Sequence, residues 1–354
     1  MMSKTTVAVL AAVVGLSILP SPAGAGGGHV NLYSYRQPFL MKPLLDAFTR
    51  KTGITVSMVY AKTGMLERLK AEGRNSPADA VLTVDIGRLT DLVRAGLVQP
   101  VASPALSANI PPQYRHPDGL WFGLTTRARV IYADKTRVKP GEVSTYEDLA
   151  DPRFKGRVCT RSGKHAYNIS LVAAFIAAKG EKAAEAWARG VKANLARRPQ
   201  GNDRAQVRAI KEGECDVALG NSYYMGKMAT NGKKPEQKAW AAAVTIIFPN
   251  QPRAGLPDGS ALGRGTHVNL SGAAVTKSAK NRDNAIRLLE FLSGDFAQRI
   301  YAAQNFEYPV KPGVPLNPLV ASWGTFKADT VNLTEVAKYR AAAAKIMDRV
   351  AFDH

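Results

Sequence analysis

Short runs rich in β-branched and aromatic residues alternate with helix-like stretches along almost the whole chain, and this alternation constrains the fold more than any other feature. Residues 29–35 and 54–60, for example, have strand character and flank a stretch in which Leu44, Leu45 and Phe48 recur at helical spacing. The same alternation continues towards the C-terminus. The pattern predicts an α/β protein.

The length of the chain predicts two lobes. Residues 26–354 are too many for one compact core. We expect the chain to cross between lobes near residues 125 and 248. Lobe one would then hold residues 26–125 and 249–298, and lobe two would hold residues 126–248 and 299–354.

The N-terminus has the features of a secretory signal peptide. Lys4 precedes an apolar run over residues 7–19, and the small residues Ala23-Gly-Ala25 follow it. The run is shorter than the roughly 20 residues that a membrane-spanning helix needs. We therefore expect residues 1–25 to be removed near Ala25 and the mature protein to be exported to the periplasm.

The formal net charge is +20. Such a charge can indicate nucleic acid, an anionic membrane or a small anionic ligand as the partner. Export argues against nucleic acid, and the basic residues are scattered, with no run longer than two. Most of them are expected on the solvated surface.

The chain contains two cysteines, Cys159 and Cys215, and each flanks a strand-like segment. In an exported protein such a pair favours a disulfide, which would stabilise the fold by roughly 4 kcal/mol in the chain-entropy model. Two unpaired buried thiols are the alternative.

Known catalytic and cofactor signatures are absent from the sequence. There is no nucleophile elbow, zinc-protease motif, phosphate-binding loop or dinucleotide fingerprint. The five histidines show no metal-ligand spacing, and the acidic residues form no calcium loop. We therefore expect a binding protein rather than an enzyme.

Tyrosines at strand-to-helix junctions are the remaining candidates for chemistry. Tyr223 and Tyr224 follow a buried-type strand at the expected start of a helix, and Tyr167 stands in an equivalent place after another strand. Ligands of α/β proteins bind at such junctions, where helix N-termini favour anions. Phenolates are ligands for a hard trivalent cation, and three of them balance the charge of Fe(III). Ordinary packing of these tyrosines stays open at this point.

Several stretches in order resemble the ferric-ion-binding family of bacterial periplasmic proteins. They include Val30-Asn-Leu-Tyr-Ser-Tyr-Arg and Gly220-Asn-Ser-Tyr-Tyr. The others are residues 75–79, 83–89, 121–130, 159–163 and 167–173. The resemblance covers nearly the whole mature chain.

This resemblance implies a type II periplasmic binding protein, with two α/β lobes that close on the ion and an inner-membrane ABC permease as the partner. It implies that Tyr167, Tyr223 and Tyr224 bind Fe(III) and that the protein is a monomer. Lobe one departs from the family, because Gln37 and Pro38 occupy the places of a His or His-Tyr ligand.

Arginines are the other residues to which the resemblance assigns a role. Val84 occupies the place of a glutamate ligand found in some members, so an anion such as carbonate is expected to complete the iron shell. Arg36 and Arg127 are its expected binding residues, since a guanidinium suits a planar oxyanion. Arg129 is a competing candidate. Tyr35 either points into the cleft as a substitute ligand or is buried by strand alternation, so it is not counted among the expected ligands.

Two other hypotheses remain. The same fold could bind an organic anion, a phosphate-bearing solute or an iron chelate, which ferric-free binding would reveal. A secreted enzyme that uses a tyrosine or lysine is the third, and only turnover would support it.

Overall fold

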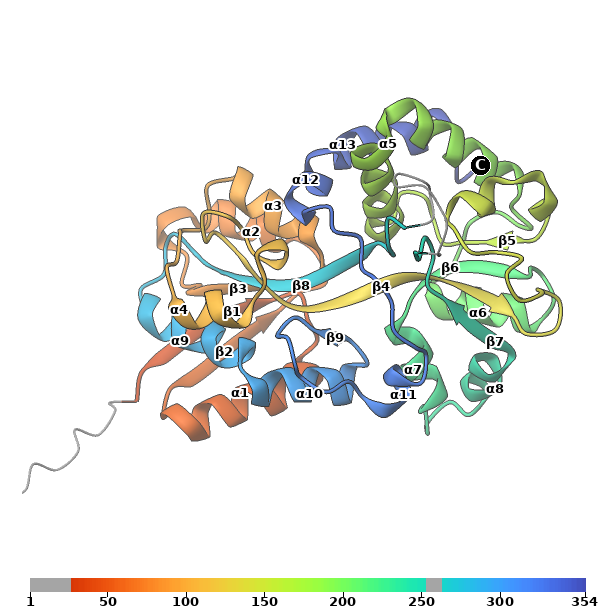
Figure 1. Ribbon diagram of the computed structural model, residues 1–354. Coiled ribbons are helices and arrows are strands. Elements are labelled where there is room, and N and C mark those ends of the chain that lie inside the picture. Colours follow the sequence, from red (N-terminus) through yellow and green to blue (C-terminus); the bar gives the residue numbers. More distant parts are fainter. Residues whose placement is uncertain (1–26, 253–262) are drawn as a thin grey trace, which may run out of the picture.

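The computed structural model describes residues 27–252 and 263–354, so the expected signal peptide lies outside the described residues. Figure 1 shows two α/β halves with the strands β4 (Phe122–Asp134) and β8 (Val268–Val275) running between them. We call the half that contains the N-terminal strands lobe one and the other half lobe two.

The described strands form one curled sheet in the order β2-β1-β3-β8-β4-β6-β5, with β7 and β9 also paired to β4. Strands β1 and β2, β1 and β3, and β5 and β6 are parallel, whereas β8 and β4 are antiparallel. The remaining bounds are β1 (His29–Ser34), β2 (Thr55–Tyr60), β3 (Ala80–Thr83), β5 (Val158–Cys159), β6 (Val217–Asn221), β7 (Val244–Ile247) and β9 (Tyr308–Pro309).

Strand β4 connects the two lobes because its hydrogen-bonding partner changes along its length. Residues up to Ala128 pair with β8 in lobe one, and residues from Arg129 onwards pair with β6 in lobe two. The crossing expected near residue 125 therefore falls inside β4. Beyond residue 248, the backbone N–H groups of Asn250 and His267 still donate to Ser144 and Tyr146 of lobe two, and β8 then runs along β4 back into lobe one.

The helices of lobe one pack around strands β1 to β3 and β8. Helix α1 shows why such segments are helical: Pro38 occupies its first turn, its apolar face is buried, and Gly53 ends it at φ 71°. The bounds are α1 (Pro38–Thr52), α2 (Met65–Glu72), α3 (Ile86–Arg94), α4 (Pro104–Asn109), α9 (Arg282–Ser293) and α10 (Asp295–Asn305).

The helices of lobe two pack around strands β5 to β7. Element α5 consists of two helical stretches that meet at a kink at Gly180, where φ is 82°. The bounds are α5 (Ala166–Ala193), α6 (Asp203–Lys211), α7 (Tyr223–Ala229), α8 (Glu236–Ala243), α11 (Pro318–Ala321), α12 (Leu333–Lys338) and α13 (Arg340–Arg349).

The C-terminal segment also joins the two lobes. Helix α10 packs in lobe one, where Tyr301 is buried, so the boundary expected after residue 298 falls within this helix. Helix α12 then contacts both α3 of lobe one and α5 of lobe two (Figure 1). Arg340, at the start of α13, forms an ion pair of 2.7 Å with Asp85 at the start of α3.

The structure joins Cys159 and Cys215 in a disulfide with Cα atoms 5.9 Å apart. Both cysteines are buried, and the bond connects the end of β5 to the residues that precede β6. It therefore ties together the two parallel strands that lead towards Tyr167 and Tyr223.

Within residues 27–252 and 263–354, no helix is both long enough and apolar enough to cross a membrane.

Candidate metal centre

Three tyrosines converge from the starts of two helices. Tyr167 lies in the first turn of α5, and Tyr223 and Tyr224 begin α7 immediately after β6. Because β5 and β6 are parallel neighbours, the helices that follow them start close together. The hydroxyl oxygens of Tyr167 and Tyr223 are 3.5 Å apart, and the rings of Tyr223 and Tyr224 stack with centroids 4.3 Å apart.

These tyrosines line a cleft of about 270 Å³ between the lobes. Lobe two also contributes Arg204 and Lys227, and the crossing strands contribute Arg127 and Ser271. The remaining lining residues are Tyr35, Arg36, Gln37, Phe39, Leu40, Val84 and Glu307. All five residues that the sequence nominated for the iron and its anion thus face one cleft.

Burial keeps the phenols of Tyr223 and Tyr224 protonated while no cation is bound. It raises the pKa of Tyr224 to about 12, and burial together with the neighbouring tyrosines raises the pKa of Tyr223 well above its ordinary value. Both phenols are neutral near pH 7, and they ionise there only if a bound cation stabilises the phenolates.

The two arginines expected to bind the anion, Arg36 and Arg127, differ in whether a carboxylate neutralises their charge. Arg36 is buried and forms an ion pair of 2.9 Å with Glu307, and it also donates to Ser271 at 2.6 Å. Arg127 donates to the carbonyl of Val84 and to Ser271 at 3.4 Å, and it has no acidic partner among the described residues. Arg127 therefore leaves a full positive charge at the cleft.

Arg129, the competing candidate, points into lobe two instead. It is buried, it forms an ion pair of 2.9 Å with Asp203, and it donates to Asn168 at 2.8 Å. It is not among the residues that line the cleft. The structure thus favours Arg127 over Arg129 as the arginine available to a ligand.

Lobe one offers few ligand atoms. Gln37 and Val84 line the cleft, whereas Pro38 occupies the first turn of α1. The hydroxyl of Tyr35 accepts a hydrogen bond from the backbone of Leu66 at 3.2 Å. Tyr35 therefore lines the cleft, but its hydroxyl is already hydrogen-bonded to the backbone of lobe one.

Sequence reasoning missed four polar or charged residues of the cleft, Arg204, Lys227, Ser271 and Glu307. Arg204 lies over the ring of Tyr224 at 5.0 Å from its centroid, and Lys227 lies over Tyr223 at 5.3 Å. Glu307 and Ser271 both accept hydrogen bonds from Arg36. No motif marks any of them, and Lys227 alone stands near the tyrosines in sequence.

Other metal-binding chemistry is not assembled in the part of the chain that the structure describes. No three His, Cys, Asp or Glu side chains gather there in a way that could hold an ion. His165 contacts the ring of Tyr167, and burial lowers its pKa to about 4, which leaves its imidazole neutral. Phenolates are therefore the main metal-ligand type in the cleft.

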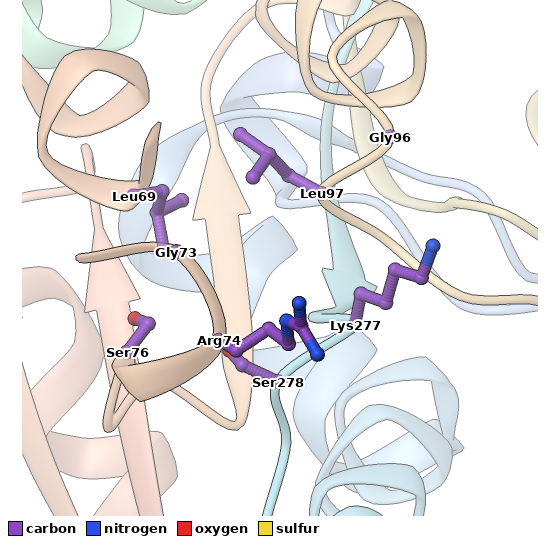
Figure 2. Close-up of a pocket in the computed structure, with 8 residues that line it drawn as sticks. All are labelled: Leu69, Gly73, Arg74, Ser76, Gly96, Leu97, Lys277 and Ser278. Carbon is purple, nitrogen blue, oxygen red and sulfur yellow. The ribbon is translucent and has the colours of Figure 1, made fainter. Parts of the chain in front are cut away.

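A second pocket, shown in Figure 2, is larger but has a different character. It measures about 660 Å³ and lies in lobe one, where Leu69, Arg74, Leu97 and Lys277 line it. It contains no tyrosine and no carboxylate. Size alone therefore does not locate the candidate site.

Comparison with known proteins identifies the family. Residues 75–327 match the family of bacterial extracellular solute-binding proteins. The chain belongs to this family. As a family of solute-binding transport proteins it is not an enzyme family, and the type II binding-protein fold expected from the sequence is confirmed by structural relatives.

Several solute-binding relatives are named for iron. Iron uptake protein A1 of Synechocystis is 49% identical over 90% of this chain and 86% of its own length. Ferric iron-binding protein A of Mannheimia haemolytica, solved in an open conformation, is 49% identical with a TM-score of 0.85, covering 93% of this chain and 100% of its own. A Trichodesmium relative solved with iron and citrate is 44% identical with a TM-score of 0.86, covering 92% and 100%.

Proposed function

We propose that this protein is the periplasmic ferric-iron-binding component of an ABC iron transporter, with Tyr167, Tyr223 and Tyr224 binding Fe(III) as phenolates. The observation that carries the proposal is the convergence of these three phenols in one cleft of about 270 Å³ between two lobes. The iron-related names of relatives up to 49% identical support it.

The charge of the site suits a trivalent ion. Three phenolates carry three negative charges, which equal the charge of Fe(III). The raised pKa of Tyr223 and Tyr224 means that a weakly polarising cation would leave these phenols protonated. The site therefore favours ferric over ferrous iron.

A small anion completes the iron shell in this proposal, and carbonate is the expected one. Arg127 is its main binding residue, because its guanidinium lacks an acidic partner among the residues that the structure describes. Arg36 donates a hydrogen bond to the same serine, Ser271. It orients the anion from the lobe-one side, although the carboxylate of Glu307 already balances its charge.

Transport follows from the two lobes. The exported protein, acting as a monomer, closes its lobes on iron and presents the closed form to an inner-membrane ABC permease. Sedimentation of the empty and iron-loaded protein tests the first part, since a monomer keeps one molar mass while its shape becomes more compact.

Substitution of the tyrosines tests the ligand assignment. Tyr223→Phe and Tyr224→Phe should each abolish or strongly weaken the coloured phenolate–iron complex while leaving the fold intact. Tyr33→Phe is the matched control, because Tyr33 hydrogen-bonds Glu72 at 2.8 Å and does not line the cleft. Full colour in both cleft variants would reject the assignment.

The second candidate function keeps the cleft and changes the cargo to an iron chelate, an organic anion or a phosphate-bearing solute. Two observations favour it. Arg36, Arg127, Arg204 and Lys227 line the cleft against the single carboxylate of Glu307, and the Trichodesmium relative was solved with iron and citrate. Binding of citrate or phosphate that survives strict removal of ferric ion would support this candidate.

A further inference from the structure

A buried carboxylate behind the tyrosines is the least expected feature of lobe two. Asp203 lies at the first position of α6, and its side chain is fully buried. One oxygen accepts from Arg129 at 2.9 Å and from the backbone N–H of Asn221 at 2.8 Å. The other oxygen accepts from Arg161 at 3.0 Å.

These contacts connect Asp203 to Tyr167 through both arginines. The guanidinium carbons of Arg161 and Arg129 lie 5.0 Å and 5.8 Å from the centroid of the Tyr167 ring. Arg129 also donates to Asn168, the residue that follows Tyr167, at 2.8 Å. Asp203 thus fixes two cations over the tyrosine ring and, through Arg129, the side chain of Asn168 beside it.

The same carboxylate holds the segment that carries the other two tyrosines. Asn221 is the last residue of β6 and stands two positions before Tyr223. Its carbonyl is fixed as well, since it accepts from the hydroxyl of Tyr132 at 2.6 Å. Arg204, which follows Asp203, lies over the ring of Tyr224.

We infer that Asp203 is a positioning residue for the tyrosine cluster: it holds Arg161 and Arg129 over Tyr167 and fixes the end of β6 before Tyr223. The inference rests on the proposed function. It goes beyond it because Asp203 does not line the cleft and touches neither the iron nor the anion.

The physical reason is that one carboxylate keeps two guanidinium groups close together. A buried carboxylate that bridges two arginines by charge-assisted hydrogen bonds fixes both forks in one orientation. Without its charge, Arg129 and Arg161 repel each other and turn away from Tyr167. Groups that orient the ligands of a metal typically change metal affinity by about 10- to 100-fold when they are mutated.

The chain provides a matched control on the same strand. Asp216 also bridges two arginines, accepting from Arg137 and Arg157 at 2.6 Å each. It directly precedes β6, at the end opposite Asn221. Removing the charge of Asp216 therefore breaks a carboxylate bridge between two arginines in the same lobe, but this bridge does not contact the tyrosines.

The experiment compares Asp203→Asn and Asp216→Asn in the full-length mature protein. Ferric affinity is measured by competition with citrate, the ligand-to-metal absorption band is recorded at saturation, and thermal unfolding of the iron-free proteins reports stability. Arg161→Gln is the second cluster variant, since it leaves the pairing of Arg129 with Asp203 in place and keeps the inference testable if Asp203→Asn fails to fold.

We expect Asp203→Asn and Arg161→Gln to lower ferric affinity about 10- to 100-fold and to shift the wavelength or intensity of the band. Asp216→Asn should lower the unfolding temperature while leaving band and affinity unchanged. The inference is overturned if the cluster variants keep wild-type band and affinity, or if Asp216→Asn changes them equally. Absence of any band in the wild-type protein would instead reject the proposed function itself.

Discussion

Iron binding by the phenols of Tyr223 and Tyr224 should release protons, and this provides a quantitative prediction. Between pH 6 and 8 the phenols of Tyr223 and Tyr224 are protonated in the iron-free protein, because the pKa of Tyr224 is about 12 and that of Tyr223 is also raised. Ionising a group of pKa about 12 at pH 7 costs roughly 7 kcal/mol, at 1.36 kcal/mol for each pH unit. The iron has to offset this cost when it ionises Tyr224.

The sign of the pH dependence follows. The empty form holds the protons and the loaded form has lost them, so raising the pH favours the loaded form and lowering it promotes release. With the two phenols of Tyr223 and Tyr224, the apparent affinity changes by up to about 100-fold per pH unit, and each phenol accounts for about tenfold. Tyr224→Phe should therefore reduce the slope by about one proton per iron.

Calorimetry in two buffers with different heats of ionisation measures the protons directly. Iron is added as one ferric chelate throughout, so that the protons taken up or released by the chelate cancel between proteins. Tyr33→Phe, outside the cleft, should match the wild type, and Tyr224→Phe should release one proton fewer. Equal release by the wild type and Tyr224→Phe would refute phenolate binding by Tyr224.

Three other perturbations have defined outcomes. Arg127→Gln should remove most of the effect of bicarbonate on ferric affinity, measured by citrate competition; an undiminished bicarbonate effect would contradict its anion role. Replacing Cys159 and Cys215 by serine should lower the free energy of unfolding in urea by roughly 4 kcal/mol, and an unchanged midpoint would show that the disulfide adds nothing. Glu307→Gln leaves Arg36 buried without its carboxylate and should cost about 3 kcal/mol, which thermal unfolding would detect as a lower midpoint.

The tyrosines could be nominated from the sequence because their placement is local. Each follows a short buried strand and stands at the expected start of a helix, and the structure has α5 and α7 beginning at or next to Tyr167 and Tyr223. Their proximity required only that β5 and β6 be parallel neighbours, which is usual in an α/β lobe.

The two arginines of β4 could not be separated from the sequence. Arg127 and Arg129 are two residues apart, so strand alternation places them on the same face. They diverge because Arg127 pairs with Asn269 of β8 in lobe one, whereas Arg129 pairs with Asn221 of β6 in lobe two. A change of partner strand in the middle of one strand leaves no signal in the sequence.

Glu307, Ser271 and Asp203 were missed for a related reason. Ser271 and Glu307 reach Arg36 from segments more than 230 positions away in the chain, through the pairing of β8 and β9 with β4. An isolated acidic residue at the start of a helix, such as Asp203, is ordinary in sequence. Asp203 becomes distinctive only in the structure, where it is buried between Arg129 and Arg161.

A visible absorption titration of the iron-free protein with ferric ion, with and without bicarbonate, tests the central claim most directly. The account predicts a broad charge-transfer band that saturates at one iron per protein and that strengthens when bicarbonate is present. The absence of any band at saturating ferric ion would contradict phenolate binding by Tyr167, Tyr223 and Tyr224, and the anion-binding function would then become the leading one.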